Sequence, residues 1–378
     1  MFTPLKVNSP ARRINTTSLT PKQGLDLRDL PQLLKPSQAI KLKNYIIDAD
    51  GGLKKRGGLS QLFNASSATA ITAIEEWTSD ILVIGYATSK VAAYRISTGV
   101  LTDIKTDFVQ PVSDLERYGN YCFVAAPRDK IGRLSMTIAY DGQTGNFTSG
   151  LLVTGGTSGA TGIILTDVDA GATGTLTLGN VTGTFADNEI ITDSSTGSAT
   201  VNGTLNFVFT SITAAPKAKW ITAINNRLVA GNLFNDEQAV QYSDIDSGAN
   251  PPFDNWTTAS TDADKGGVVR YKNAGNVNVV TNLGDNIIVG CDSGKWAFVI
   301  DTIDSAGTLT KFDRTVANFT DAGMKKAIQT SDGLYYVNKT GLWLMQSIGQ
   351  NNVKFSEQEA LVSTILGDSY FADFDFDS

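Results

Sequence analysis

Four loops of this sequence carry a residue pattern that could bind a metal ion. In each loop two aspartates stand two residues apart and a glycine follows, at residues 48–52, 167–171, 244–248 and 262–266. Paired carboxylates in a glycine-terminated loop can bind calcium through their oxygen atoms. No glutamate follows at the EF-hand spacing, and aspartate and glycine are also the ordinary residues of turns. The pattern leaves two interpretations, calcium loops or structural turns, and we favour turns.

The other reactive residue types exclude several forms of catalysis. The chain has no histidine, which excludes Ser-His-Asp and Cys-His catalysis and histidine-ligated zinc. Its two cysteines, Cys122 and Cys291, stand in apolar runs that predict strands, and neither has the basic neighbours that activate a thiol. We expect two buried free thiols. The alternative is a disulfide, which needs an oxidising compartment and a suitable separation.

One segment, Cys-Asp-Ser-Gly-Lys-Trp at residues 291–296, is similar to the aspartate box of sialidase propellers. In such a box the Asp-Gly turn ends a hairpin and the tryptophan packs between strands, so even a true match is structural. A sialidase also needs a three-arginine clamp and a tyrosine nucleophile, and the scattered arginines indicate neither. No phosphate-binding or dinucleotide-binding glycine loop is present. We therefore expect no enzymatic activity, no catalytic residue, no cofactor and no bound metal.

The composition indicates an acidic globular protein. Among its 378 residues, Lys+Arg 31 and Asp+Glu 38 give a net charge of −7. A broad basic face for nucleic acid is not expected, because such affinity comes from neutralised phosphates. Neither a signal peptide nor a run of roughly 18 apolar residues is found, so we expect no membrane span and synthesis in the cytoplasm. One basic cluster stands out and is either a solvated hairpin or a contact for an acidic partner or DNA: Lys41, Lys43, Lys54, Lys55 and Arg56.

A short strand pattern recurs along the chain. In each copy a polar turn residue leads into an apolar run that ends on a small residue. The copies lie at residues 80–85, 120–125, 226–231, 285–290 and 333–338, so their first residues are 40, 106, 59 and 48 apart. A strand unit that returns every ~40 to 60 residues is typical of β-propeller blades, each of which is a four-stranded sheet. The alternative is another all-β protein, in which turns also lead into apolar runs.

Composition divides the chain into four parts. Residues 1–40 predict an extended N-terminal arm, because five prolines interrupt any regular element. Residues 41–145 and 211–378 predict the two parts of an all-β, β-propeller-like body of about five to six blades. Between them, residues 146–210 are rich in glycine and threonine with alternating apolar residues, which predicts a small inserted β domain.

The clearest blade is expected at the start of this body. Its four predicted strands lie at residues 70–77, 81–86, 90–96 and 100–104. A second blade runs from Val112 to about residue 141. At the other end of the sequence, residues 371–378 alternate Phe with Asp, which predicts a strand with one buried face.

Several segments resemble the tail hub and nozzle proteins of short-tailed bacteriophages. Residues 44–59 begin with Asn and continue through a Gly-Gly-Leu turn to a Lys-Lys-Arg-Gly-Gly step. Residues 244–256 contain a proline loop and an Asn-Trp pair. The resemblance is strongest over residues 283–366, with Gly-Asp-Asn-Ile-Ile-Val-Gly, then Trp296, then a Gly-Leu-Trp step. Residues 158–185 are similar to a small β module found among tail proteins of marine phages.

This resemblance implies a structural virion protein, located in the tail and synthesised in the cytoplasm of the bacterial host. Such proteins form a homo-hexamer ring around the channel through which DNA leaves, next to portal and adaptor proteins, and dock tail fibre or needle proteins. Double-stranded DNA passes through without specific binding, which suits an acidic wall that repels phosphate. The alternative is a receptor- or glycan-binding propeller anchored by exposed aromatic residues such as Trp256. A propeller hydrolase is the least favoured hypothesis.

Overall fold

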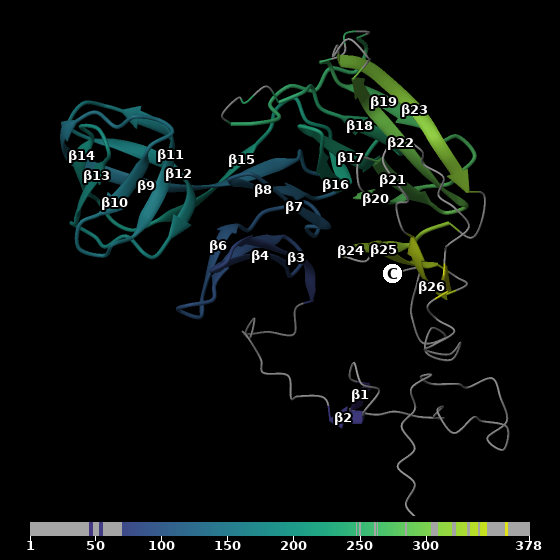
Figure 1. Ribbon diagram of the computed structural model, residues 1–378, viewed down its shortest axis with the longest axis horizontal. Coiled ribbons are helices and arrows are strands. Elements are labelled where there is room, and N and C mark those ends of the chain that lie inside the picture. Colours follow the sequence, from purple (N-terminus) through teal and green to yellow (C-terminus); the bar gives the residue numbers. More distant parts are fainter. Residues whose placement is uncertain are drawn as a thin grey trace, which may run out of the picture. The chain divides into compact units, whose positions relative to one another are not determined.

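The computed structural model describes most of the chain between residues 70 and 345. The described residues are 45–47, 53–55, 70–246, 248, 251–260, 262, 264–283, 286–303, 309–319, 323–330, 333–338, 341–345 and 360–361. Every regular element among them is a β-strand, so the predicted all-β class is confirmed (Figure 1). The chain divides into two units, one of Met1–Ser60 with Leu361–Ser378 and one of Gln61–Ala360.

Five antiparallel sheets, which we call blades 1 to 5, follow one another along the chain. Blade 1 consists of β3 (Ile71–Thr78), β4 (Ile81–Tyr86), β5 (Lys90–Arg95) and β6 (Val100–Lys105). Blade 2 consists of β7 (Asp114–Tyr118), β8 (Tyr121–Ala125), β9 (Gly132–Gly145) and β15 (Asn206–Ser211). Blade 3 consists of β16 (Ala218–Ile224), β17 (Arg227–Leu233), β18 (Asp236–Tyr242) and β19 (Gly267–Arg270).

The last two sheets have the same order of strands. Blade 4 consists of β20 (Val277–Leu283), β21 (Asn286–Cys291), β22 (Gly294–Ile303) and β23 (Leu309–Phe319). Blade 5 consists of β24 (Lys326–Thr330), β25 (Gly333–Asn338), β26 (Gly341–Met345) and β27 (Ala360–Leu361). The predicted strands of blade 1 agree with the observed ones to within one or two residues.

The first strands of successive blades are neighbours. Strand β3 lies against β7, β7 against β16, β16 against β20, and β20 against β24. Sheets that are joined in this way through their first strands are the blades of a β-propeller, in which the first strand of each blade is the innermost one. The body is therefore β-propeller-like, and we call β3, β7, β16, β20 and β24 the inner strands.

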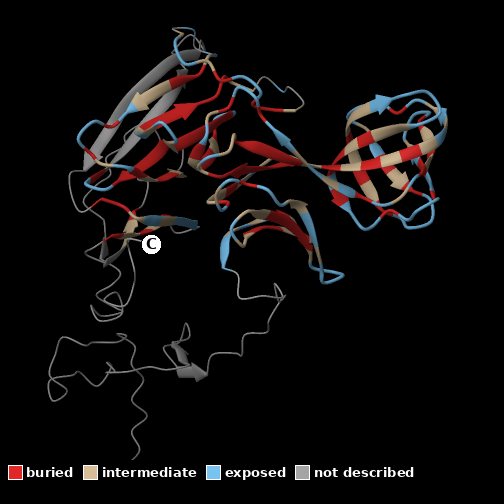
Figure 2. Cartoon of the chain, turned by 180° about the vertical axis from the view of Figure 1, so that it is seen from behind, coloured by how far each residue is buried: buried red, intermediate tan, exposed pale blue. Residues whose placement is uncertain are grey.

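The recurring sequence pattern marks the second strand of each blade, namely β4, β8, β17, β21 and β25. These strands are apolar on both faces because each blade packs against other parts of the chain on both sides. All residues of β8 and of β21 are buried, for example (Figure 2). In the first three copies the polar residue that opens the pattern, Asp80, Asn120 or Asn226, lies in the turn after the inner strand. At Asn226 this turn requires a positive φ of 56°, which asparagine tolerates better than most residues.

The small residue near the end of the pattern is explained by the approach of the next blade. Three of the copies have glycine there, at Gly85, Gly231 and Gly290. A Cβ atom at Gly85 would lie 2.8 Å from Val112, and one at Gly290 would lie 2.5 Å from Met324. A Cβ atom at Gly231 would overlap Val280. Each of these neighbours stands in or just before the next inner strand, so the glycines let successive blades pack closely.

A small barrel interrupts blade 2 between its third and fourth strands. It contains β10 (Leu152–Gly155), β11 (Thr161–Asp169), β12 (Gly174–Thr182), β13 (Ile190–Asp193) and β14 (Ser198–Val201). These strands pair in the order β12-β11-β10-β13-β14-β9, and β12 also pairs with β9, so the sheet closes on itself (Figure 1). Closure leaves no unpaired sheet edge.

Strand β9 belongs to both the blade and the barrel. Residues 132–137 of β9 pair with β15 of the blade, whereas residues 136–145 pair with β12 and β14 of the barrel. Apolar side chains fill the barrel interior, including Val153, Ile164, Leu176, Ile191 and Val201, each at 0% exposure (Figure 2). The glycine- and threonine-rich segment therefore folds around an apolar interior, which is continuous with the buried cluster of blades 1 and 2.

Three further predicted segments are described in part or not at all. The basic cluster includes a short antiparallel hairpin of β1 (Tyr45–Ile47) and β2 (Leu53–Lys55). The predicted arm at residues 1–40 and the alternating segment at residues 371–378 lie outside the described residues. In the described part of the chain no helix has the length and hydrophobicity of a membrane span.

Candidate functional site between the inner strands

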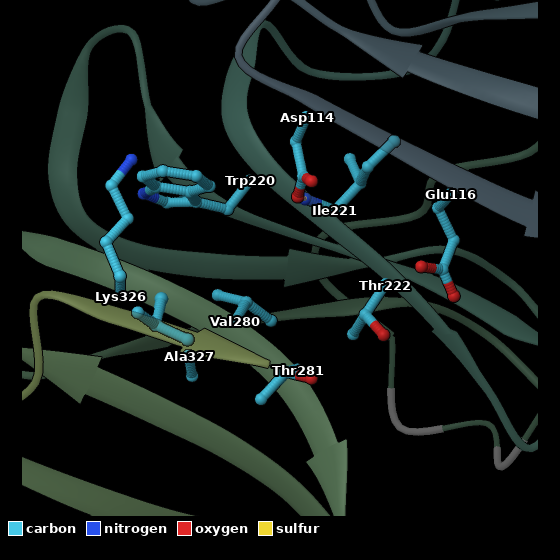
Figure 3. Close-up of a pocket in the computed structure, with 10 residues that line it drawn as sticks. Asp114, Glu116, Trp220, Ile221, Thr222, Val280, Thr281, Lys326 and Ala327 are labelled. Atoms are coloured by element: carbon cyan, nitrogen blue, oxygen red, sulfur yellow. Dashed lines mark hydrogen bonds between the residues drawn. The ribbon is translucent and has the colours of Figure 1, made fainter. Parts of the chain in front are cut away.

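A cleft of about 140 Å³ lies among the inner strands of blades 2 to 5 (Figure 3). Its lining comes from four strands that are far apart in the sequence. The lining residues are Asp114 and Glu116 of β7, Trp220, Ile221 and Thr222 of β16, Val279, Val280 and Thr281 of β20, and Lys326 and Ala327 of β24. Carboxyl groups thus stand on one side of the cleft, and an indole ring and an ammonium group stand on the other (Figure 3).

The carboxyl side joins blades 2 and 3. Asp114 accepts a hydrogen bond from the backbone N–H of Ile221 at 2.9 Å, and Glu116 accepts one from the N–H of Ala223 at 2.8 Å. Residues two apart on a strand face the same side, so the two carboxyl groups meet alternate N–H groups of β16. These N–H groups lie on the edge of β16 that its partner β17 leaves free. Side chains therefore replace the missing strand partner at this blade boundary.

Burial changes the protonation of both groups. It raises the pKa of Asp114 to about 8 and that of Glu116 to about 7, although the backbone hydrogen bonds act in the opposite direction. Glu75 of β3 adds a third negative charge nearby, and burial raises its pKa as well. Near neutral pH this side of the cleft therefore holds a mixture of carboxylic acid and carboxylate.

These pKa values predict a pH-dependent stability. The folded pKa values of Asp114 and Glu116 lie above the ordinary 3.8 and 4.5, so the folded state binds more protons between those limits. The stability that these two groups contribute is then fully present below their ordinary pKa values and is lost as the pH rises toward about 8. We expect the free energy of unfolding to fall by several kcal/mol, at most about 6 kcal/mol, between pH 5 and pH 8.5 in urea titrations.

The double variant Asp114→Asn, Glu116→Gln keeps an oxygen acceptor for each N–H group and removes both charges. Its unfolding free energy should change much less over this pH range. Glu237→Gln, at an exposed position of β18, serves as the matched control and should keep the wild-type pH profile. Identical profiles for the wild type and the double variant would contradict the assigned role.

The opposite side of the cleft is basic. The Lys219 ammonium lies 5.2 Å from the centre of the Trp220 ring, and the Lys326 ammonium lies 4.8 Å from it. Both distances suit cation–π contacts. Burial lowers the pKa of Lys219, and the charge of Lys326 lowers it further. Three nitrogen groups that can donate hydrogen bonds are therefore gathered around one aromatic ring.

Where the structure describes the aspartate loops, the carboxylates stabilise turns by accepting hydrogen bonds from backbone N–H groups. Asp244 accepts hydrogen bonds from the N–H groups of Thr257 and Gly266, both at 2.9 Å. Burial alone would raise the pKa of Asp244, but these bonds outweigh it and lower the pKa. Asp169 likewise accepts a bond from the N–H of Gly171 at 2.7 Å. Among the described residues no three Asp, Glu, Cys or His side chains converge as metal ligands, and the loop at residues 48–52 lies outside them.

The segment at residues 291–296 contains the end of β21, the turn at residues 292–293 and the start of β22. Asp292 accepts hydrogen bonds from the Asn276 N–H at 2.8 Å and from the Lys325 ammonium at 3.1 Å. It therefore ties this turn to the beginnings of β20 and β24. The side chain of Trp296 lies outside the described side chains.

Both cysteines are buried in strands and unpaired, as predicted. Burial raises the pKa of Cys291 to about 12 and holds that of Cys122 well above its usual range. Both sulfur atoms are therefore thiols rather than reactive thiolates at neutral pH.

The prediction that Trp256 is an exposed aromatic anchor is wrong. Its side chain is 7% exposed and packs in a cluster with Phe253 and Phe123. The indole N–H donates to the Phe253 carbonyl oxygen at 3.0 Å. The loop folds back because burying a large ring removes much apolar area from water, and the nearby carbonyl satisfies its polar atom. A ligand cannot reach Trp256 in this arrangement.

The residues of the cleft do not stand out in the amino-acid sequence. The available signal was charged or aromatic residues within predicted inner strands, such as Asp-Leu-Glu at residues 114–116 and Lys-Trp at residues 219–220. Such short combinations are common on half-exposed strands and do not specify a site. Only the alignment of four inner strands brings them together.

Comparison with known proteins finds solved structures with a similar fold but no matching sequence. Neither a protein-family model nor a curated protein sequence matches the chain. The β-propeller domain of Myceliophteria thermophila Cps50 (Swd1) is similar with 11% identity and a TM-score of 0.32, covering 73% of this chain and 83% of that one. Kluyveromyces lactis Hsv2 has 13% identity and a TM-score of 0.30, with 75% and 76% covered.

A computationally designed protein, Ika4, is also similar to this chain. It has 12% identity and a TM-score of 0.30, and the match covers 68% of this chain and 99% of that one. At these TM-scores the fold is assigned from the sheets of this chain, and the functions of the similar proteins say nothing about its own.

Proposed function

We propose that this chain is a structural subunit of the tail of a short-tailed bacteriophage, where copies form a nozzle or hub ring around the DNA-ejection channel. One observation carries the proposal. Two of the segments that resemble such proteins fall on equivalent strands of successive blades: residues 286–290 lie in β21 and residues 333–336 lie in β25. A resemblance that follows the blade repeat indicates shared architecture better than scattered matches would.

The charge distribution supports a wall that does not hold DNA. Between Arg133 and Lys217 the sequence has no lysine or arginine. The same interval contains the carboxylates Asp141, Asp167, Asp169, Asp187, Glu189 and Asp193. Like charge repels phosphate, so double-stranded DNA would pass through the ring without specific binding. In this proposal the copies form a hexamer that contacts portal or adaptor proteins and tail fibre or needle proteins.

The test is cryo-electron microscopy of purified particles in which mass spectrometry has detected this chain. A short tag inserted after Gly171, at an exposed turn of the barrel, provides the matched comparison with untagged particles. We expect a closed ring on the tail axis, with the extra density of the tag on a small lobe of each subunit. Tag density on peripheral appendages alone would overturn the nozzle proposal and favour receptor binding.

A further inference from the structure

Asn202 and Gly203 form the only Asn-Gly pair in the sequence. They lie directly after β14, in the segment that leads from the barrel back to β15 of blade 2. Asn202 is exposed, so water reaches its side-chain amide. Asparagine is a thermally labile residue, and a following glycine has no side chain to hinder an attack by its backbone nitrogen. The pair therefore has the chemistry of a deamidation site.

Deamidation at this pair needs only the two residues and water. The backbone nitrogen of Gly203 attacks Cγ of Asn202 and forms a new C–N bond. The side-chain amino group leaves as ammonia and takes the proton of the attacking nitrogen with it, so that a cyclic succinimide remains. Water then opens one of the two ring C–N bonds. The product at position 202 is either aspartate or isoaspartate.

The nitrogen that would attack is held by a carboxylate. The Gly203 N–H donates to Oδ1 of Asp187 at 2.7 Å. The other oxygen of Asp187 accepts a hydrogen bond from the side-chain amide of Asn188 at 2.9 Å, which also orients the carboxylate. A negative charge beside the N–H group opposes the loss of its proton. The hydrogen bond also keeps the nitrogen from turning toward the side chain of Asn202.

The backbone next to the pair is held as well. The N–H of Asn202 donates to the carbonyl oxygen of Ala139 in β9 at 2.9 Å, and the N–H of Asn188 donates to that of Val201 at 3.0 Å. Attack by the Gly203 nitrogen therefore requires a local opening of this segment. The population of such an open state depends on the hydrogen bonds that close it.

We propose that Asn202 is a site of spontaneous deamidation and that Asp187 sets its rate by holding the Gly203 N–H group. Deamidation places a second carboxylate close to Asp187, and isoaspartate also lengthens the backbone where the barrel returns to the blade. Both changes weaken the contact between the loop at residues 183–189 and the segment after β14. This modification is separate from the proposed place of the chain in a tail ring, and each can fail without the other.

Mass spectrometry of the full-length chain during incubation in mildly alkaline buffer tests the proposal. Chymotrypsin can release the fragment between Phe185 and Phe207, and a synthetic peptide of residues 198–206 gives the rate without the fold. We expect Asn202 to react at least about tenfold more slowly in the folded chain than in the peptide. Asn180, which is exposed in the same barrel and precedes valine, should keep its amide. Equal rates in chain and peptide would overturn the proposed control of the rate.

Three variants test the part of Asp187. Asp187→Ala removes the acceptor and should raise the rate at Asn202 at least about tenfold, whereas Asp187→Asn keeps an oxygen acceptor and should react more slowly than Asp187→Ala. Asp169→Ala is the matched control, because this exposed carboxylate of the barrel accepts the N–H of Gly171 at 2.7 Å. It should react at the wild-type rate.

Circular dichroism verifies the fold of each variant. Equal rates for Asp187→Ala and Asp169→Ala would overturn the role of Asp187. An unchanged Asn202 in the Asp187→Ala chain after the peptide has reacted completely would overturn the site itself.

Discussion

Replacing Gly231 with valine is expected to lower the free energy of unfolding by about 3 kcal/mol, at the upper end of the cost of overpacking a core. Gly231 is buried in β17, and a Cβ atom there would lie 3.1 Å from Val277 Cγ1 and would overlap Val280 Cγ2. Both valines belong to β20, the inner strand of the next blade. Strand β17 pairs with β16 on one edge and β18 on the other, so it cannot move aside without breaking a sheet.

Urea unfolding followed by tryptophan fluorescence measures the effect. Thr102→Val places the same side chain at an exposed position of β6 and should change stability by no more than about 0.5 kcal/mol. A double-mutant cycle adds a sharper control. Gly231→Ala and Val280→Ala should each destabilise the chain alone, and together they should cost less than their sum, because the smaller side chain makes room for the new methyl group. A Gly231→Val protein as stable as the Thr102→Val protein would contradict the assigned packing.

The second strands of the blades could be predicted from the sequence because local and tertiary requirements agree there. In β8 and β21 every residue is buried, so a continuous apolar run specifies both the strand and its place in the interior. The glycines could be seen in the sequence pattern, but the reason why these positions require a residue without a side chain could not. A larger residue at position 85 would collide with Val112, which lies in the loop before the next blade. A sequence pattern does not show such a contact.

The closure of the barrel and the cleft depend on pairings that are distant in the sequence. Strand β12 closes the barrel by pairing with β9 in the register Gly174↔Tyr140 to Leu178↔Met136. In the cleft, Asp114 and Ile221 are 107 residues apart. Alternating polarity predicts that each of these strands has two different faces, but it does not specify which strand lies beside it. Trp256 illustrates the same limit, because a tryptophan in a polar loop can be a surface anchor or part of the core.

Replacing Arg227 with methionine is expected to destabilise the chain by about 2–4 kcal/mol, because it leaves one buried and one partly buried carbonyl group without a charged donor. Arg227 is 0% exposed at the start of β17, in the third copy of the strand pattern. Its guanidinium donates to the carbonyl oxygens of Ser243, at 2.6 Å, and Lys265, at 3.1 Å, and lies 5.5 Å from the centre of the Tyr242 ring. One side chain thus joins the segment after β18 to the segment before β19.

Methionine is shorter but close in volume and has no donor, so the variant removes the hydrogen bonds while it keeps most of the volume of the side chain. Arg270→Met is the matched control, because its guanidinium forms an ion pair with Asp236 on the exposed side of blade 3 and is itself 55% exposed. An exposed pair of this kind contributes at most about 1 kcal/mol. Equal losses for the two variants in urea unfolding would contradict the role of Arg227. A larger loss for Arg227→Met would mean that a charged residue within an apolar strand pattern is required by the blade, since it satisfies carbonyls that the sheet leaves unpaired.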